Sequence, residues 1–443
     1  MRVFFTNLGC KLNQAENDRL ARDFLAAGHQ LAAALGEADL HVVNSCTVTA
    51  AAARSSRQAA RAATRGAPGR RPRTVLTGCY ATASPAEAAR LAGVDLVVPN
   101  AAKEHLLERV LQAFPEAAAA ALPDVPATAR LPHGNTRALV KIEDGCDMRC
   151  SFCIIPSTRG RQRSRPPADV VNEVRGLALS GYREIVLTGV QISAYRGGTL
   201  GTPAAAVRRR RNGLAGLVRE VLAALPAAAA IPAARLRLTS IAPWDLDDEL
   251  LALWEDCRLC RHLHLSLQSG ATATLRRMRR PYTAEIYGRL VEKVRAAVPG
   301  VAVTTDVIVG FPGETAAELE ESLATVTALG FAKVHVFPFS PRPGTAAATL
   351  PGAVPPPELR QRMARMLAVA ARAELAFRLA HLGRREIVLW ERPRGGTGQG
   401  LTDNYIRVFS PEGAGLWNRL GEVELLALAP GGMVGRVVQD GVS

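Results

Sequence analysis

Three cysteines with a short fixed spacing constrain this chain more than any other feature of its sequence. Cys146, Cys150 and Cys153 follow directly on an apolar run, 138–142, that has the character of a buried strand. Three thiolates in a C-x3-C-x2-C loop can hold three irons of a [4Fe–4S] cube, because thiolate is the ligand that iron–sulfur clusters select. No fourth cysteine follows in the loop, so the fourth iron would stay open for a substrate or cofactor.

Two other uses of a cysteine-rich loop fit this sequence less well. A zinc knuckle needs a fourth cysteine or histidine nearby, and the loop offers neither. A disulfide framework is typical of small secreted domains, whereas this chain has 443 residues and eight cysteines. The spacing therefore favours the cluster.

Length and composition indicate a large folded protein. At ~150 residues per domain, 443 residues predict roughly three domains, and 48 % hydrophobic residues are enough to form their cores. No apolar run reaches the ~18 residues of a membrane span, and the N-terminus lacks the pattern of a signal peptide. We therefore expect a cytoplasmic protein with no membrane part.

The formal net charge of +15 suggests a polyanionic partner such as nucleic acid. Almost all of the 55 basic residues are arginines, and alanine tracts at 117–121 and 227–230 indicate a biased coding composition that raises arginine everywhere. The charge is thus supporting evidence only.

Residues 1–114 alternate short apolar runs with helix-length amphipathic stretches, which predicts an N-terminal domain with an open parallel α/β sheet. The expected strands are 2–7, 40–44, 74–77 and 96–98. The expected helices are 17–27, 54–65, 85–91 and 103–114.

Three more cysteines each come just after an expected strand. They are Cys10 in NLGC, Cys46 in NSC and Cys79 in TGC. Because the carboxyl ends of parallel strands meet at the edge where such folds bind ligands, we expect these thiols to converge. Three unrelated buried cysteines would account for any one of them, but not for their shared position. The pattern predicts a second three-cysteine site whose cluster faces the same cavity as the first.

Residues 115–136 are rich in alanine and proline and are expected to be a linker. Residues 137–345 then repeat a strand and a helix six times, which predicts a partial (βα)6 barrel with its active site at the strands' carboxyl ends. The strands are expected at 138–142, 184–188, 235–239, 262–267, 301–309 and 333–338. The helices are expected at 169–179, 214–225, 246–256, 283–297 and 316–329, and a further helix at 358–382 completes a core domain of 137–382.

Two features inside this core have more than one interpretation. The segment 196–213 carries four consecutive arginines, 208–211, and is expected to be a solvated insertion rather than a phosphate contact. Cys257 and Cys260 form a lone C-x2-C pair, which is incomplete as a metal site and is expected to supply buried structural thiols.

Residues 383–443 change character and predict a small all-β barrel with strands at 386–391, 402–410, 421–427 and 434–439. Such barrels commonly bind RNA, although a purely structural cap is the alternative. Tyr405 and Phe409 are candidates for stacking on bases. The basic candidates are Arg384, Arg385, Arg392, Arg394 and Arg407.

With these features in place, the chain resembles the methylthiotransferases of the radical S-adenosylmethionine (SAM) superfamily. That family joins an N-terminal three-cysteine domain, a radical SAM barrel and a C-terminal TRAM-type barrel. Phe152, directly before the third cysteine of the loop, is a further point of similarity. The motifs that carry the resemblance are NLGCKLNQAE, NSCTVT, TGCY, GCDMRCSFC, IIPSTRGRQRSR, LHLSLQSGA, VIVGFPGE and FPFSPRPGT.

The resemblance implies two [4Fe–4S] clusters and SAM as cofactors. It implies that the cluster on Cys146, Cys150 and Cys153 cleaves SAM to a 5′-deoxyadenosyl radical. An auxiliary cluster on the N-terminal cysteines would carry the sulfur, which a first SAM methylates before a substrate radical takes the methylthio group. A cofactor-derived radical suits this reaction, because an inert C–H bond defeats acid–base chemistry. A flavodoxin or ferredoxin as electron donor and a sulfur source are implied partners.

The resemblance also indicates a substrate. LGCKLNQ, NSCTVT and GCY are most similar to the group that acts on threonylcarbamoyladenosine at position 37 of tRNA, in the anticodon loop. The expected reaction is methylthiolation at C2 by a monomeric enzyme. The alternatives are isopentenyladenosine in tRNA, an aspartate of a ribosomal protein, and an iron–sulfur RNA-binding protein without turnover.

Four strand-end residues are predicted to contact SAM together with Phe152. They are Thr188, Gly189, Gln268 and Gly310. Glycines allow the backbone to approach a cofactor closely, and Gln268 has an amide for the ribose or amino acid part. Each of the four also fits a turn or packing role.

Overall fold

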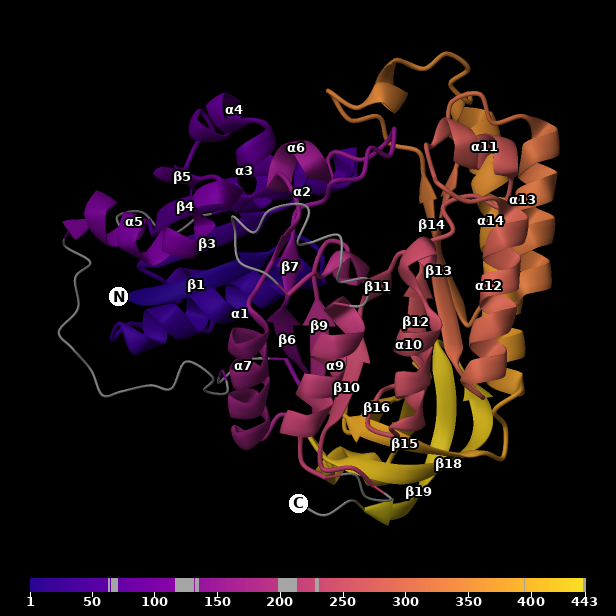
Figure 1. Ribbon diagram of the computed structural model, residues 1–443. Helices are drawn as coiled ribbons and strands as arrows, with labels where there is room; N and C mark the ends of the chain where they lie inside the picture. Colours follow the sequence, from indigo (N-terminus) through magenta and orange to yellow (C-terminus); the bar gives the residue numbers. More distant parts are fainter. Residues whose placement is uncertain are drawn as a thin grey trace.

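The computed structural model of this chain describes residues 1–62, 64, 71–115, 131, 135–197, 213–227, 231–393 and 395–440. These residues form an N-terminal α/β sheet, a larger α/β core and a C-terminal closed barrel (Figure 1). No helix in the described ranges is long and apolar enough to span a membrane. The arginine run 208–211 and most of the expected linker lie outside the described residues.

The N-terminal part is a five-stranded parallel sheet with the order β2-β1-β3-β4-β5. Its strands are β1 (Arg2–Asn7), β2 (Gln30–Leu31), β3 (Leu40–Ser45), β4 (Arg73–Gly78) and β5 (Leu96–Val98). β3 is buried at every residue, as a central strand of such a sheet should be. The four predicted strands are confirmed, and the two-residue β2 was missed.

Helices cover both faces of this sheet. They are α1 (Lys11–Ala26), α2 (Ala50–Ala62), α3 (Cys79–Ala83), α4 (Pro85–Ala89) and α5 (Leu106–Ala113), with short 3-10 turns η1 (Leu35–Glu37) and η3 (Asn100–His105). α1 begins directly after Cys10, six residues before the predicted start. The strand order reverses between β1 and β3, and such a switch point is where open α/β sheets bind ligands.

The core is a split parallel barrel. One sheet has the order β10-β9-β6, with β6 (Ala138–Lys141), β9 (Glu184–Thr188) and β10 (Arg235–Leu238). The other has the order β11-β12-β13-β14, with β11 (Ser240–Ile241), β12 (His262–Leu265), β13 (Ala302–Val309) and β14 (Lys333–Pro338). The backbone of Leu236 joins them, since its N–H donates to Arg258 O and its carbonyl accepts from Cys260 N, at 2.7 and 2.8 Å.

Helices line the outside of the core, and Figure 1 shows the last of them along one side of the molecule. The main helices are α7 (Pro167–Leu179), α9 (Gly213–Ala224), α11 (Thr272–Arg277), α12 (Ala284–Ala297), α13 (Ala316–Leu329) and α14 (Pro356–Leu379). The helix predicted at 246–256 is instead α10 (Asp248–Leu251) followed by the 3-10 turn η7 (Ala252–Glu255). Shorter elements are β7 (Glu143–Asp144), α6 (Ile155–Arg159), β8 (Arg163–Ser164), η5 (Ile192–Ala194), η6 (Pro243–Asp245) and η8 (Ala346–Thr349).

The core strands are apolar outside and polar inside. Their outward residues form one hydrophobic cluster with the helices, for example Leu187, Leu265 and Val307. Successive strand residues point to opposite faces, so Glu184, Arg237, His264, Asp306 and His335 face the interior. Branched apolar residues usually fill the inside of a parallel barrel, and this polar lining therefore indicates a site.

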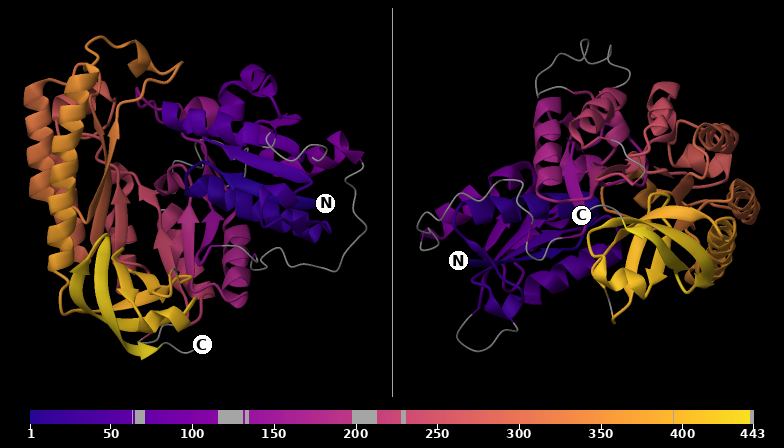
Figure 2. Two further views of the ribbon diagram at one scale, coloured as in Figure 1. Left: turned by 180° about the vertical axis from the view of Figure 1, so that it is seen from behind. Right: turned by 90° about the horizontal axis from the view of Figure 1, so that it is seen from below.

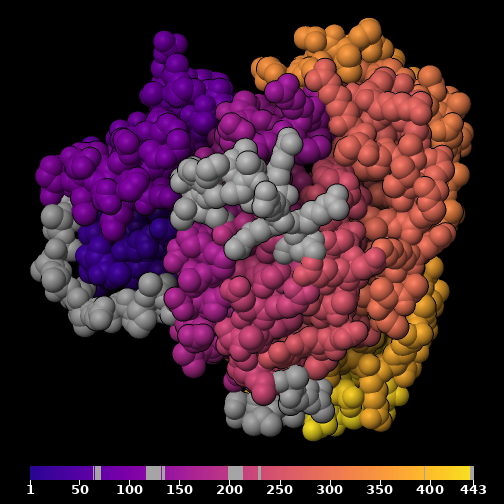
Figure 3. Space-filling view, in the orientation of Figure 1, coloured from indigo at the N-terminus to yellow at the C-terminus, as the bar shows by residue number. Residues whose placement is uncertain are grey.

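The N-terminal part closes the open side of the split barrel. Its helix α1 packs on β6, at one edge of the barrel. At the other edge, Arg342 after β14 donates to Thr47 Oγ1 at 3.0 Å, and Ala50 N donates to Ser340 Oγ at 3.1 Å. Figure 3 shows the N-terminal part directly against the core. The sheet edge that carries Cys10, Cys46 and Cys79 is thereby joined to the core.

The C-terminal part is a closed five-stranded barrel under the N-terminal ends of the core strands (Figure 2). Its strands are β15 (Arg385–Trp390), β16 (Gly398–Thr402), β17 (Arg407–Ser410), β18 (Leu420–Ala429) and β19 (Gly432–Asp440), with the 3-10 turn η9 (Glu412–Gly415). The single strand predicted at 402–410 was wrong, because a turn with Tyr405 at φ 70° divides it.

Buried arginines of the core hydrogen-bond to the backbone of this barrel. Arg235 and Arg237 donate to the carbonyl oxygens of Leu401 and Thr402 at 2.8 and 3.0 Å. Both guanidinium groups share the carboxylate of Glu184, which is 0 % exposed and also pairs with Arg137. Burial by itself raises the pKa of Glu184, but the three arginines together hold it well below its usual range.

Replacing Glu184 by alanine should lower the free energy of unfolding by about 3–5 kcal/mol, because the buried Arg235 and Arg237 and the partly exposed Arg137 would lose their shared partner. Denaturant unfolding followed by circular dichroism measures the change. The matched control is Glu249→Ala, which removes the partner of Arg219 from an exposed ion pair and should cost at most about 1 kcal/mol. Equal losses in the two variants would contradict the role given to Glu184.

Candidate functional site

The first cysteine trio lies on the loop between β7 and α6, at the carboxyl end of the first core strand. Two of its sulfurs accept hydrogen bonds, Cys146 Sγ from Met148 N and Cys150 Sγ from the Arg280 guanidinium, both at 3.4 Å. N–H donors aimed at sulfur suit thiolates, and such bonds tune iron–sulfur clusters. The loop therefore has the donor set that a cluster needs.

The second trio lies at the carboxyl edge of the N-terminal sheet. Cys10 caps the start of α1, Cys46 follows β3, and Cys79 opens α3. Gly78, directly before Cys79, has φ 96°, and a Cβ there would lie 2.4 Å from Ser45 O. Only glycine fits this close approach of the two strand ends. The topology thus sets Cys46 and Cys79 side by side.

Within each trio the thiols lie close enough to influence one another. Burial raises the pKa of Cys46, and the neighbouring Cys79 and Cys10 raise it further. In the loop, burial raises the pKa of Cys153 to about 12, with added contributions from Cys150 and Cys146. The structure therefore brings together both predicted trios. Metal binding would have to displace protons from these thiols.

The two trios differ from a site for a single ion. In the described ranges, no three His, Cys, Asp or Glu side chains are placed to share one metal ion. A four-iron cube attaches each thiolate to a different iron, which spreads the sulfurs further apart. All eight cysteines are free of disulfides. The residues present fit clusters rather than zinc.

Two asparagines connect the trios. Asn13 Oδ1 accepts from Arg159 Nη2 at 2.5 Å and lies 3.9 Å from Cys10 Sγ. Asn100 Nδ2 lies 3.6 Å from Cys79 Sγ and donates to Thr158 O at 2.9 Å. Thr158 and Arg159 belong to α6, which follows the cysteine loop. One short helix thus contacts the surroundings of both Cys10 and Cys79.

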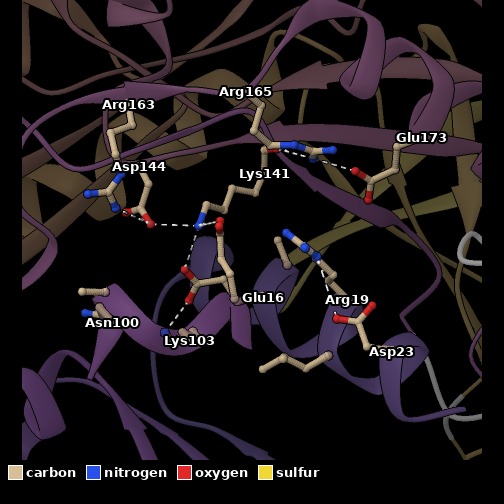
Figure 4. Close-up of a pocket in the computed structure, with 14 residues that line it drawn as sticks. Glu16, Arg19, Asp23, Asn100, Lys103, Lys141, Asp144, Arg163, Arg165 and Glu173 are labelled. Atoms are coloured by element: carbon tan, nitrogen blue, oxygen red, sulfur yellow. Dashed lines mark hydrogen bonds and ion pairs between the residues drawn. The ribbon is translucent and has the colours of Figure 1, made fainter. Parts of the chain in front are cut away.

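Arg159 is the centre of a buried ionic network between the two domains. Its guanidinium is 2.9 Å from both Glu16 of α1 and Asp144 of β7. Lys103 and Lys141 surround the same carboxylates, at 2.7 Å from Glu16 and 2.8 Å from Asp144 (Figure 4). Burial alone would raise the pKa of Glu16, but Lys103, Arg159 and Lys141 hold it well below its usual range. Sequence reasoning missed all five residues.

This network borders a cavity of about 250 Å³ between α1, η3 and β6, shown in Figure 4. Asn100 lines the cavity and also contacts Cys79. A second cavity, of about 280 Å³, lies beside Cys146 and is lined by Gln191, Trp244 and Asp245. Each trio therefore borders a cavity, and the prediction that both clusters face a single cavity stays a prediction.

Comparisons with known proteins agree with this geometry. Residues 140–326 match the radical SAM superfamily, and residues 2–99 match uncharacterized protein family UPF0004. The threonylcarbamoyladenosine tRNA methylthiotransferase MtaB of Bacillus subtilis is 33 % identical over 100 % of this chain and 98 % of its own length. The tRNA-2-methylthio-N(6)-dimethylallyladenosine synthase of Erythrobacter litoralis is 34 % identical over 98 % of this chain and 96 % of its own.

The chain belongs to the radical SAM methylthiotransferase family. The predicted cofactors, [4Fe–4S] clusters and SAM, are those of this family. The fold agrees with a solved structure, the radical SAM methyltransferase TsrM from Kitasatospora setae with cobalamin and a [4Fe–4S] cluster bound. That comparison has a TM-score of 0.56 at 17 % identity and covers 79 % of this chain and 77 % of TsrM.

The residues predicted to contact SAM have structural roles of their own in this methylthiotransferase. A Cβ on Gly189 would lie 2.7 Å from Glu143 Oε2, and one on Gly310 would lie 2.4 Å from Leu359. Gln268 has φ 70° and bonds through its backbone to β13. Thr188 is buried, and the ring of Phe152 meets Phe311 edge-on. Their contacts to SAM stay predictions.

Other polar groups near the cysteine loop were not found from the sequence. Gln191 Oε1 lies 3.5 Å from Cys146 Sγ, and its amide donates to Asp245 at 3.0 Å. Arg280, which bonds Cys150, lies 4.7 Å from the ring of Trp244. Gln191 is three residues after Thr188. It would have been predicted if the candidates at this strand end had been extended beyond Gly189. Arg280 could not be identified as a site residue from the sequence, because it is one arginine among many.

Two secondary predictions are corrected by the structure. Tyr405 stacks on His262, with ring centres 4.3 Å apart, and is therefore used in domain packing rather than exposed for a base. Of the pair expected to be buried, Cys260 is buried but Cys257 is exposed. Of the basic candidates for RNA contact, Arg407 pairs with Glu391 within the C-terminal barrel, and Arg394 lies outside the described residues.

Replacing Glu16 by glutamine should lower the stability of the enzyme by about 3 kcal/mol at neutral pH, because Arg159 and Lys103 lose a buried countercharge. The folded pKa of Glu16 is lowered, so its contribution is present above the ordinary carboxyl pKa of about 4.3 and is lost as pH falls further. Denaturant unfolding of both proteins across pH 3–7 measures this difference, which should shrink at the acid end.

The control for this experiment is Glu104→Gln. Glu104 is exposed and lies 3.9 Å from the same Lys141, so its loss should be small at every pH. A Glu16→Gln difference that stayed constant down to pH 3 would contradict the depressed pKa.

Proposed function

We propose that this enzyme attaches a methylthio group to C2 of N6-threonylcarbamoyladenosine at position 37 of tRNA. The observation that carries the proposal is the pairing of two cysteine trios through α6. The helix follows one trio, and its Thr158 and Arg159 reach the asparagines beside Cys79 and Cys10. A reaction that joins a radical step to sulfur transfer needs two such centres near each other.

Each trio would hold one [4Fe–4S] cluster. Cys146, Cys150 and Cys153 would hold the cluster that binds SAM. The auxiliary cluster would be held by Cys10, Cys46 and Cys79. When bound, these groups supply the radical and the sulfur. The chain's own residues hold the thiolates and position their ligands. Arg280 places a positive charge beside Cys150, and Asn100 places a neutral amide N–H donor beside Cys79. The cavity beside Cys146 is our candidate site for SAM.

The choice of adenosine substituent rests first on the motifs LGCKLNQ, NSCTVT and GCY. It also rests on relatives such as MtaB of Thermotoga maritima, which is 34 % identical over 88 % of this chain and 86 % of its own length. The second candidate is the isopentenyl-type adenosine, since relatives named for dimethylallyladenosine are equally similar. A ribosomal protein substrate has no such support among these relatives.

The C-terminal barrel is our candidate TRAM-type RNA-binding domain, and the predicted limits 1–114, 137–382 and 383–443 are kept for the three domains. We infer a monomeric cytoplasmic enzyme that receives electrons from a flavodoxin or ferredoxin and sulfur from a separate source. The net charge of +15 favours a tRNA partner.

Mass spectrometry of tRNA nucleosides from cells lacking the gene tests this function. We expect loss of the 2-methylthio form and accumulation of threonylcarbamoyladenosine, because the last step is missing. The wild-type gene should restore the product, whereas Cys10→Ala and Cys150→Ala should leave less than about 1 % of it, since each removes a ligand from one cluster.

The matched control is Cys257→Ala. It removes an exposed cysteine outside both trios and should restore the product fully. Loss of 2-methylthio-isopentenyladenosine instead would select the second candidate, and an unchanged nucleoside profile would end the tRNA assignment.

A further inference from the structure

The polar interior of the core has a layer that the cysteine sites do not use. In this layer His264 Nε2 lies 3.1 Å from Asp306 Oδ2 and its Nδ1 lies 3.0 Å from Thr304 Oγ1. The ring of His335 stands 5.9 Å from that of His264. Asp306 and His335 are register partners on β13 and β14. The layer is thus built by three adjacent strands of the barrel.

The layer is accessible rather than sealed. The side chain of Asp306 is 28 % exposed. Burial lowers the pKa of His335, so its ring is neutral at physiological pH and offers one N–H donor. In the part of the chain that the structure describes, no side chain hydrogen-bonds the His335 ring. An accessible donor and carboxylate of this kind are available to a ligand.

The N-terminal domain adds a cation to this interior. Lys11 follows the cluster cysteine Cys10, and its Nζ lies 5.9 Å from the ring centre of Tyr405. Tyr405 stacks on His262, whose Nε2 lies 3.0 Å from Thr304 Oγ1, so Tyr405 and His262 connect the exposed side chain of Lys11 to the polar layer. Its charge also contributes to the lowered pKa of His335. Over the described ranges no carboxylate pairs with Lys11.

Lys11 also lines a cavity of about 490 Å³ where the three parts of the chain meet. Cys10 and Leu139 of β6 line it too, as do Glu391 and Arg392 of the C-terminal part. This volume is within the range of sites that hold ligands of nucleoside size. A base that enters here would meet Lys11 next to the auxiliary trio.

We propose that Lys11, with His335 and Asp306, selects the substrate by binding the carboxylate and polar groups of the N6 substituent. This assignment rests on the proposed function. The threonylcarbamoyl group carries a carboxylate for Lys11, an oxygen for the His335 N–H, and N–H and O–H donors for Asp306. An isopentenyl group offers none of these and would make no polar contact with Lys11, His335 or Asp306, so the site should prefer the threonylcarbamoyl group.

The test compares binding of two anticodon stem–loop RNAs to the full chain with its clusters reconstituted. One RNA carries threonylcarbamoyladenosine at position 37 and the other isopentenyladenosine, and fluorescence anisotropy gives each Kd. Lys11→Met should weaken the first RNA roughly 10- to 100-fold, since it removes a charged contact, and change the second less than about twofold. His335→Phe, which keeps a ring without N–H, should reduce the same preference.

Two controls separate this role from general attraction to phosphate. Lys11→Arg keeps the charge and should keep most of the preference. Lys293→Met removes a lysine from the outer helix α12, where it pairs with Asp248, and should change neither RNA.

Equal weakening of both RNAs by Lys11→Met, or no change in either, would overturn the proposal. Wild-type preference for isopentenyladenosine would overturn it as well. A failure of the proposed function is read separately, as the absence of a 2-methylthio product on the first RNA by mass spectrometry while its binding preference persists.

Discussion

The buried ion pairs around Arg159 are the interaction on which the arrangement of this enzyme depends. A single guanidinium, 3 % exposed, is shared by a carboxylate of the N-terminal sheet domain and one of the radical SAM core. A charge removed from water this far is tolerated only when it is fully paired. The network therefore specifies how the domains dock. Through Asn13 and Asn100 that docking also sets where the two cysteine trios stand.

The core barrel is incomplete alone, and both flanking domains complete it. The N-terminal domain contacts β6 and the segment after β14, the two open edges. The C-terminal barrel covers the other end through Glu184 and the arginines around it. Lys11 and Tyr405 enter the interior from these flanking domains. The interior is therefore lined by side chains from all three domains.

Much of this could be predicted from the sequence, for a physical reason. Buried parallel strands are continuous apolar runs, so nearly all core and N-terminal strands were predicted within two residues. Thiolate ligands leave a clear signature in spacing and in strand-end position, so both trios were predicted to converge. The two-residue β2 has no such run. The turn at Tyr405 was missed because a non-glycine residue at positive φ has no compositional signal.

The docking network could not be predicted, because charged residues are normally solvated. Glu16 and Arg159 are 143 positions apart, and nothing local marks them as partners. The role of Lys11 could not be predicted either, because a lysine next to a cysteine indicates no function before the barrel interior is known. Asn13 lies in the motif NLGCKLNQAE, but its role follows only from its contacts to Ser45 O and Arg159.

We propose that both trios hold clusters and that the two clusters lie close enough to interact. The most direct measurement is electron paramagnetic resonance of the anaerobically reconstituted, reduced enzyme, beside variants in which one trio or the other is replaced by alanine. Each variant should keep the signal of one cluster, and the wild-type spectrum should show magnetic interaction between two. A wild-type spectrum equal to the sum of the two variants would contradict this proximity, and a missing signal from the N-terminal trio would contradict its cluster.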